Sequence, residues 1–340
     1  MRGYHGRMTP ADAPNPLRIF DGINSYQRTF ALKAAVELDI FRHIGAGVTD
    51  VAELAARCHA SPKGVRVLCD YLTIIGFLTK AGDRYGLVPD SAAFLDSSSP
   101  TFIGTMFYFL AHSQHLAHFT DLAAVVRKGG AVHGRGNMEP EAPIWVEFAR
   151  WMAPMSAFAA RELAAVVNTP GRPMKVLDIA AGHGAYGIAV ATLNPLATVY
   201  AQDWKNVLEL ARDQAARAGV GDRYHTIPGS AFDVNLGSGY DLVLLPNFLH
   251  HFDVDTNVQL LRKVRNALAE GGRVATVEFV PNDDRVSPAP AASFSLMMLA
   301  STERGDAYTF HELDGMFRAA GFGQSRMQPL GPQTLILTDR

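Results

Sequence analysis

The segment Val176-Leu177-Asp178-Ile179-Ala180-Ala181-Gly182-His183-Gly184 decides the fold, because it runs from an apolar stretch into a glycine-rich turn. A side chain in such a turn would keep a bound ligand away from the backbone, so glycine is needed there. Alone, the pattern is weak evidence for a ligand. It is strengthened by Asp203, twenty-five residues after Asp178 at the end of the next apolar stretch. A carboxylate at that position can accept hydrogen bonds from both hydroxyls of a ribose.

The position of Asp178 narrows the kind of cofactor. In a nicotinamide-binding motif the first glycine directly follows the strand, whereas Asp178 precedes Gly182 by four residues. This arrangement is the form found in class I methyltransferases. It predicts that Asp178 meets the methionine end of S-adenosylmethionine. The alternative is a tight turn that binds nothing.

Strands and helices alternate around this segment, after Pro173. Apolar strands separated by helices are typical of a parallel sheet covered on both faces, so we expect a doubly wound, Rossmann-like α/β domain. Strands are expected at 175–179, 198–202, 224–228, 241–246, 273–279 and 333–337, and helices are expected to begin at Ala185, Lys205, Asp255 and Phe310.

The N-terminal part has a winged-helix pattern. One helix begins near Thr49 or Asp50, and a second follows Ser61-Pro62, where serine can cap and proline can take the first helical position. The hairpin pattern 77–87 comes next. DNA binding by this part would need basic residues on an exposed face, but the candidate helix offers only Lys63 and Arg66, beside Asp70.

The segment 101–169 contains further helices, rich in aromatic residues and methionine. Such residues form a core or the wall of an apolar ligand pocket, and the pattern leaves both readings open. The stretch 127–143 contains glycine and proline and predicts a loop. We therefore divide the chain into a winged-helix part, 1–100, helices beside the substrate pocket, 101–169, and a cofactor-binding domain, 170–340.

Composition favours a small-molecule partner. The 340 residues carry a net charge of −2, so no general field attracts a nucleic acid. The two cysteines, Cys58 and Cys69, have no metal-ligand spacing and are expected to be reduced thiols. The N-terminus is polar, and no apolar stretch is long enough for a membrane span. These features predict a cytoplasmic protein.

Two segments further along resemble the plant-type O-methyltransferases, such as the caffeic acid, flavonoid and acetylserotonin enzymes, and their bacterial relatives. In Asn247-Phe-Leu-His250-His251-Phe252-Asp253, His250 takes the position of the family's catalytic base. Twenty-eight residues later, Glu278 matches the carboxylate that orients this base. The resemblance covers nearly the whole chain. It implies a helical, winged dimerisation domain and hence a homodimer.

The chemistry of methyl transfer requires these residue types. The methyl group of a sulfonium is already activated, so the enzyme must align an oxygen nucleophile with it and remove a proton. An imidazole with an ordinary pKa of about 6.5 can accept that proton near neutral pH. Glu278 would then stabilise the imidazolium and fix its tautomer.

A structural role is the alternative for His250 and His251, which would then cap the strand end and pack beneath the next helix. Metal binding is disfavoured because adjacent histidines on an extended strand end point to opposite faces. No ligand set of recognisable spacing accompanies them either. We therefore expect no metal.

The resemblance assigns further positions. The substrate pocket is implied to include Met155, Phe158 and Met298, and Asn247 is expected near the acceptor. The cofactor site is implied to comprise Asp178, Gly182, Gly184, Asp203, Trp204, Ser230, Phe232 and Asn247.

Three positions depart from the family pattern. A second glutamate that supports the base corresponds to Ala307, a lysine four residues before the base corresponds to Pro246, and an acid that contacts adenine corresponds to Ser230. The leading hypothesis is methyl transfer from S-adenosylmethionine to a hydroxyl of an aromatic or polyketide-like metabolite. Methylation of carbon or nitrogen, another reaction of the cofactor, and a winged-helix DNA-binding regulator remain alternatives.

Overall fold

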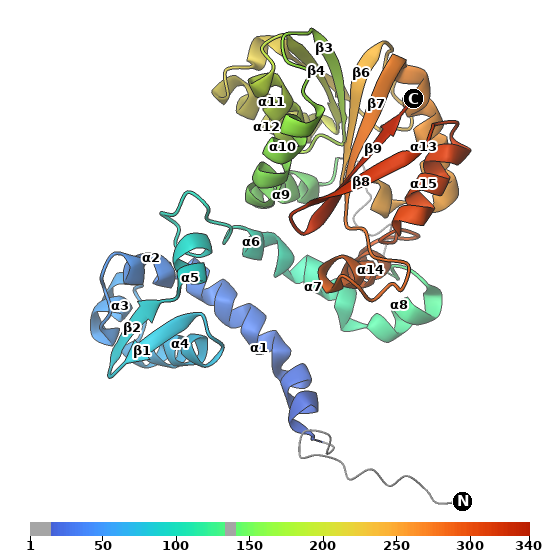
Figure 1. Cartoon of the computed structure of the whole chain (residues 1–340). Coiled ribbons are helices and arrows are strands. Elements are labelled where there is room, and N and C mark those ends of the chain that lie inside the picture. The colour runs from blue at the N-terminus through green and yellow to red at the C-terminus, as the bar shows by residue number, and fades with distance from the viewer. Residues whose placement is uncertain (1–14, 133–140) are drawn as a thin grey trace, which may run out of the picture. The chain divides into compact units, whose positions relative to one another are not determined.

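The computed structural model describes residues 15–132 and 141–340, which form two compact units that divide between Ala111 and His112 (Figure 1). The finer division predicted at residues 100 and 169 stays a prediction. In the described ranges, no helix is both long and apolar enough to cross a membrane.

The first unit has the predicted order of helix, helix and hairpin. Asp50 accepts hydrogen bonds from the backbone of Ala52 and Glu53, and Ser61 accepts one from Gly64, so both predicted caps are present. Apart from the antiparallel hairpin the unit is helical. Its elements are α1 (Leu17–Glu37), α2 (Ile40–Gly45), α3 (Val51–Arg57), α4 (Pro62–Ile74), β1 (Leu78–Ala81), β2 (Arg84–Leu87), α5 (Pro89–Phe94) and α6 (Met106–Leu110).

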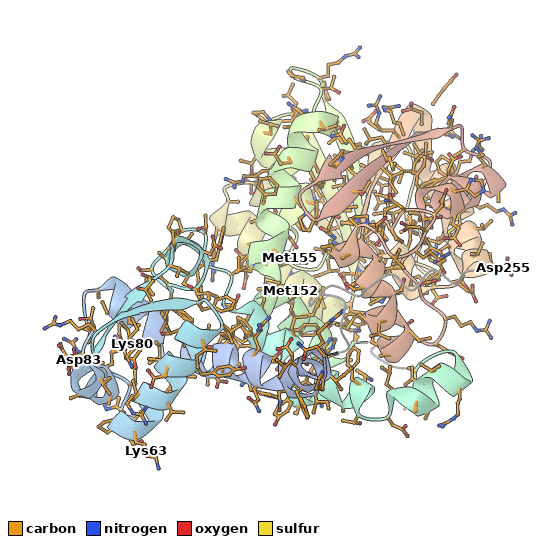
Figure 2. The ribbon with its side chains drawn as sticks, turned by 60° about the horizontal axis from the view of Figure 1, so that its bottom comes forward. Lys63, Lys80, Asp83, Met152, Met155 and Asp255 are labelled. Carbon is orange, nitrogen blue, oxygen red and sulfur yellow. The ribbon has the colours of Figure 1, made fainter. Side chains whose placement is uncertain are left out.

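Most of the positive charge beside α4 is already paired. Asp70 accepts from Arg66 at 2.8 Å, from Lys80 at 2.5 Å and from the hydroxyl of Tyr85 at 2.6 Å. The hydrogen bonds from Lys80 and Tyr85 lower the pKa of Asp70 to about 2. Figure 2 shows Lys80 on the hairpin and Lys63 at the start of α4. This pairing argues against a phosphate-binding face, as the composition does.

The second unit is built on a seven-stranded sheet of order β5-β4-β3-β6-β7-β9-β8. From β5 to β7 neighbouring strands are parallel, whereas β9 is antiparallel to both of its neighbours. The strands are β3 (Met174–Ile179), β4 (Ala197–Asp203), β5 (Tyr224–Pro228), β6 (Tyr240–Pro246), β7 (Leu268–Glu278), β8 (Ser325–Leu330) and β9 (Gln333–Asp339).

The expectation of a wholly parallel sheet is therefore wrong at one edge. All six predicted strands are present, but β8 was not predicted and β7 begins earlier, at Leu268. The sequence of β8, Ser-Arg-Met-Gln-Pro-Leu, is polar and contains proline, which is tolerated at a sheet edge. A strand of this kind carries little apolar pattern to reveal it.

Helices cover both faces of the sheet, as predicted (Figure 1). One buried cluster packs α10, α11 and α12 against the sheet, and a second packs α13 and α15 against the other face. The helices are α7 (Ser113–Thr120), α8 (Leu122–Lys128), α9 (Pro143–Trp151), α10 (Ala153–Val167), α11 (Ala185–Leu193), α12 (Lys205–Arg217), η1 (Gly221–Arg223), η2 (Leu249–His251), α13 (Val254–Ala267), α14 (Ala289–Ser301) and α15 (Phe310–Ala319).

The loop predicted at 127–143 is shorter than expected. Arg127 and Lys128 still belong to α8, which ends at the left-handed Gly129, and Pro143 begins α9. Residues 133–140 lie outside the described part of the chain.

Candidate active site

The glycine-rich turn after β3 has the backbone that its sequence predicts. Ala180, Gly182 and Gly184 have positive φ angles of 52°, 58° and 84°. A Cβ at Gly184 would lie 2.6 Å from Oη of Tyr224. Gly184 is thus required both by its conformation and by the close approach of the Tyr224 side chain.

Asp178 is fully buried at the end of β3. Its Oδ2 accepts a hydrogen bond from the backbone N–H of Gly187 at 2.9 Å. Its Oδ1 has no hydrogen-bond partner in the part of the chain that the structure describes. Burial raises the pKa of Asp178 to about 7; the N–H of Gly187 opposes this shift and the charge of Asp203 adds to it.

Asp203 ends β4 beside the same turn. Its carboxylate accepts from the N–H of Gly182 at 2.8 Å and from the N–H of Trp204 at 2.6 Å. Burial raises the pKa of Asp203 to about 6, although these two hydrogen bonds lower it. The ends of β3 and β4 thus bring two carboxylates to one glycine turn, the place where parallel sheets bind ligands.

Tyr186 is a candidate site residue that the sequence reasoning missed. Its side chain is 3% exposed, and its hydroxyl has no hydrogen bond of ordinary geometry to any described residue. Burial and the charge of Asp178 raise its pKa, while the side chain of Asn247 lowers it. An unpaired buried polar group is costly unless something satisfies it. The unpartnered Asp178 Oδ1 and Tyr186 hydroxyl therefore fit a ligand with polar groups, such as an amino acid.

His250 and Glu278 form a buried pair at the ends of neighbouring strands. Nδ1 of His250 lies 2.6 Å from Oε2 of Glu278, and the two side chains are 6% and 3% exposed. Oε1 of Glu278 also accepts from the N–H groups of Phe248 and Leu249, at 3.1 and 2.9 Å. One carboxylate therefore holds both the imidazole and the backbone that carries it.

Asn257 of α13 supports the same turn from below. It is fully buried, and its Nδ2 donates to the carbonyl oxygens of Leu249 at 2.9 Å and Phe252 at 3.3 Å. These carbonyls flank the two histidines. Glu278 and Asn257 thus fix the turn through its N–H groups and its C=O groups respectively.

The expectation that the two histidines point to opposite faces is wrong. They belong to the 3₁₀ turn η2 rather than to extended chain, and their ring centroids lie 4.3 Å apart. The ring of Trp145 meets His251 edge-on at 5.9 Å. Burial, and then the nearby His250, lower the pKa of His251 well below its ordinary value. Burial therefore favours the neutral form of His251.

Aromatic side chains surround the His250–Glu278 pair. Phe294 of α14 meets the His250 ring edge-on at 4.9 Å, and Phe279 stacks on Phe294 at 4.4 Å. Met298, predicted in the substrate pocket, is buried on the same helix. Only the aromatic character of Phe279 and Phe294 could have drawn attention to them in the sequence.

The other two predicted substrate residues lie on α10. Phe158 is 51% exposed, whereas Met155 is partly buried near Met152 (Figure 2). The start of this helix reaches the glycine-rich turn after β3, because the ring of His183 donates a hydrogen bond to the backbone carbonyl of Ala153. Burial lowers the pKa of His183 to about 4, although this hydrogen bond raises it.

The remaining predicted cofactor residues surround the two histidines and the cofactor turn. Ser230 caps its own loop by accepting from the N–H of Phe232 at 3.2 Å, and Phe232 packs edge-on against Phe252 at 4.9 Å. Trp204 directly precedes α12. Ala307, where the family has a second glutamate, is fully buried. No carboxylate can therefore support His250 from that position.

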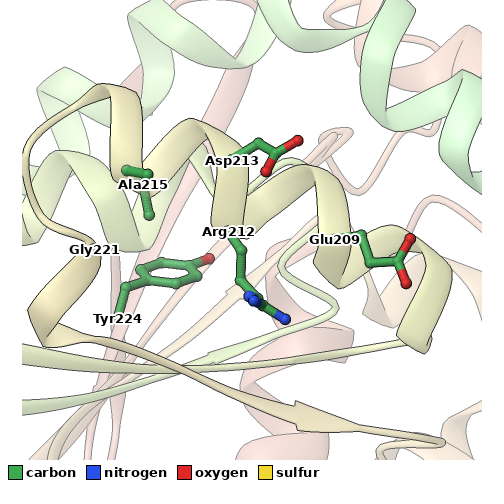
Figure 3. A pocket seen from close by; sticks show the side chains of 7 residues that line it. Glu209, Arg212, Asp213, Ala215, Gly221 and Tyr224 are labelled. Carbon is green, nitrogen blue, oxygen red and sulfur yellow. The ribbon is translucent and has the colours of Figure 1, made fainter.

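A separate hollow is lined by residues of α12 and by Gly221 and Tyr224. Figure 3 shows Glu209, Arg212, Asp213 and Tyr224 along it. None of the predicted site residues lines this hollow. It is therefore not the candidate active site.

Comparison with known proteins agrees with this geometry. An O-methyltransferase domain matches residues 119–323, and an O-methyltransferase dimerisation domain matches residues 20–97. The 3-hydroxy-5-methyl-1-naphthoate 3-O-methyltransferase of Streptomyces sahachiroi is 29% identical, over 96% of this chain and 95% of its own.

Solved structures have the same fold. One from Nostoc punctiforme, of a protein regarded as an O-methyltransferase, is 49% identical, with a TM-score of 0.93 over 96% of this chain and 100% of its own. Human N-acetylserotonin methyltransferase in complex with S-adenosylmethionine has a TM-score of 0.83 over 98% and 99% of the two chains; at 22% identity this likeness concerns the fold alone. The chain belongs to the family of S-adenosylmethionine-dependent O-methyltransferases and carries that family's dimerisation domain.

Proposed function

We propose that this protein transfers a methyl group from S-adenosylmethionine to a hydroxyl of a flat aromatic or polyketide-like metabolite, with His250 as general base. The observation that carries the proposal is the buried hydrogen bond from Nδ1 of His250 to Glu278, beside an aromatic wall. This is the arrangement that a proton acceptor for a phenol needs.

The cofactor residues are proposed from the turn and its surroundings. Gly182 and Gly184 let a ligand approach the backbone, Asp203 accepts ribose hydroxyls, and Asp178 with Tyr186 meets the amino-acid end. Bound S-adenosylmethionine supplies a methyl group activated by its positive sulfur. Further contacts are proposed for the predicted positions Trp204, Ser230, Phe232 and Asn247.

Proton transfer is the task of the His250–Glu278 pair. Because Nδ1–H of His250 donates a hydrogen bond to Glu278, the opposite nitrogen, Nε2, carries the lone pair that takes the proton of the acceptor hydroxyl. The acceptor oxygen would take the methyl group as the bond from that methyl to the cofactor's sulfur breaks, leaving neutral S-adenosylhomocysteine, and the hydroxyl proton would pass to Nε2. Glu278 then stabilises the imidazolium.

An apolar, flat acceptor suits the surroundings of the base. Phe294 and Phe279 present aromatic rings beside His250, and we propose that Met298, Met155 and Phe158 complete the pocket. The naphthoate methyltransferase of Streptomyces sahachiroi acts on a compound of this shape, as its name states.

We also propose that the protein is a homodimer. Large apolar side chains form a stripe along α1 that the first unit leaves exposed, and all of this helix from residue 20 onward lies in the matched dimerisation domain. A stripe of this kind in water marks an interface. The exposed residues are Leu17, Ile19, Phe20, Ile23, Tyr26 and Phe30.

Methylation of carbon is the second candidate. Ala307 stands where the family has a second glutamate, and one relative of similar length, 27% identical over 335 residues, is the L-tyrosine C(3)-methyltransferase of Streptomyces lavendulae. Both candidates, methylation of oxygen and methylation of carbon, are tested by incubating the protein and S-adenosylmethionine with a panel of naphthols and hydroxylated polyketides. A methyl ether supports the proposal, whereas a methyl group on ring carbon, seen by NMR, supports the alternative.

A further inference from the structure

Asn247 stands where the cofactor turn and the base meet. It follows β6 directly, has a left-handed φ of 54°, and donates its backbone N–H to Val277 at 2.7 Å. Its side chain acts on the pKa of Tyr186, and it precedes His250 by three residues. The direction in which its amide points therefore matters to both parts of the site.

Gln333 contacts this amide from the start of β9, the predicted strand that pairs with the unpredicted strand β8. Nε2 of Gln333 donates a hydrogen bond to Oδ1 of Asn247, and the Gln333 side chain is buried, with 5% exposed. Gln333 begins β9, where the next residue, Thr334, pairs with Glu278 of β7. The contact therefore comes from a strand that is locked beside the carboxylate of the base.

This hydrogen bond orients the Asn247 amide. An asparagine amide has one acceptor end and one donor end. When Gln333 occupies Oδ1, Nδ2 is left as the end that can donate elsewhere. The Tyr186 hydroxyl, which has no hydrogen bond of ordinary geometry among the described residues, is the neighbouring group of the cofactor turn.

We propose that Gln333 is a positioning residue: by holding Oδ1 of Asn247, it turns Nδ2 of Asn247 toward the Tyr186 side of the site, where both groups bind the polar amino-acid end of the cofactor. The inference rests on the proposed function. It adds a residue that was predicted to lie in a strand but not in the site, and it makes cofactor binding depend on the β8–β9 hairpin.

Calorimetric titration with S-adenosylhomocysteine tests the inference. Gln333→Glu replaces the donor with an acceptor and favours the reversed amide, so the dissociation constant should rise about tenfold, as expected for one well-placed hydrogen bond. Gln333→Met removes the donor without adding charge and should raise the dissociation constant severalfold. The matched control is Gln328→Glu, the same change on β8 of the same hairpin, and it should bind as the wild type does.

A double-mutant cycle separates positioning from simple structural support. Asn247→Asp lacks the amide nitrogen and should weaken binding by itself. Adding Gln333→Met to Asn247→Asp should then weaken the binding of S-adenosylhomocysteine no further, because no amide is left to orient. KM for S-adenosylmethionine should rise in the Gln333 variants more than kcat falls.

Two results would overturn the inference: wild-type affinity in both Gln333 variants, or full additivity in the cycle. Thermal unfolding of each variant without ligand shows whether it folds. If Gln333→Glu does not fold, the binding measurement on Gln333→Met tests the inference alone. If the wild-type protein itself binds no S-adenosylhomocysteine, it is the proposed function that fails instead.

Discussion

Nδ1 of His250 lies 2.6 Å from Oε2 of Glu278, and the other oxygen of this carboxylate accepts two backbone N–H groups of the same turn. The relationship joins catalysis to structure. A single side chain fixes the tautomer of the proposed base, its orientation and the turn that carries it.

Glu278→Gln tests this relationship. The amide keeps the size of the side chain but loses the negative charge that would stabilise the imidazolium, so we expect kcat to fall by about 10² to 10⁴. Affinity for S-adenosylhomocysteine should change little. The control is Glu270→Gln, the same substitution at an exposed position of the same strand. Unchanged kcat in Glu278→Gln would remove Glu278 from the mechanism.

Gly184→Ala tests the close packing of the cofactor turn. The new methyl group would meet Oη of Tyr224 at 2.6 Å, in a backbone with φ of 84°, and we expect a loss of about 3 kcal/mol in unfolding free energy. Gly219→Ala is the matched control, because Gly219 has φ of 72° but open space around it. It should cost only about 1–2 kcal/mol. Tyr224→Phe should recover part of the Gly184→Ala loss; equal losses in the two alanine variants would refute the packing argument.

Cofactor binding should release protons near neutral pH. Burial raises the pKa of Asp178 to about 7 and that of Asp203 to about 6, so below these values the folded, cofactor-free protein holds protons on both groups. A free aspartate ionises at about 3.9, so these two groups make the cofactor-free protein less stable as pH rises from about 4 to about 7. The ammonium and hydroxyl groups of the ligand favour the ionised carboxylates.

Affinity for S-adenosylhomocysteine should therefore increase from pH 5.5 to pH 8. Calorimetry at pH 6.5 in two buffers of different ionisation enthalpy measures the proton release. Asp178→Asn should reduce the release even where it still binds ligand. Binding without proton exchange in the wild type would contradict the assignment of these carboxylates to the cofactor.

The apolar stripe of α1 should hold the dimer together. Phe20 and Ile23 are 56% and 64% exposed in the single chain, and a charge at either position would be buried without a partner in the interface. Phe20→Glu and Ile23→Asp should shift the protein toward monomer in sedimentation velocity. Val286→Glu, at a position of the second unit that is 74% exposed, should leave the dimer intact. A monomeric wild type would contradict the proposal.

Much of the site could be predicted because its residues sit in local motifs. Asp178, Gly182 and Gly184 lie within one strand and turn, and Asp203 ends the next strand. Glu278 ends β7, and His250 lies in the turn η2 that follows the neighbouring parallel strand β6, so a spacing along the chain corresponds to a contact in space.

The rest depends on contacts that no local pattern encodes. Gln333 reaches Asn247 across 86 residues, from a hairpin whose first strand is polar and antiparallel. Tyr186 is notable only because its buried hydroxyl has, after folding, no hydrogen bond of ordinary geometry among the described residues. The wrong prediction for the orientation of His251 has a similar origin. The apolar strand predicted an extended end, whereas the chain forms a 3₁₀ turn held by Glu278 and Asn257.

The most direct test of the account is the rate of methyl transfer by His250→Ala, measured with saturating S-adenosylmethionine and an aromatic hydroxyl acceptor found in the panel. The account predicts that turnover falls by about 10² to 10⁴ or more, while S-adenosylhomocysteine binds as in the wild type. Turnover close to that of the wild type would contradict it.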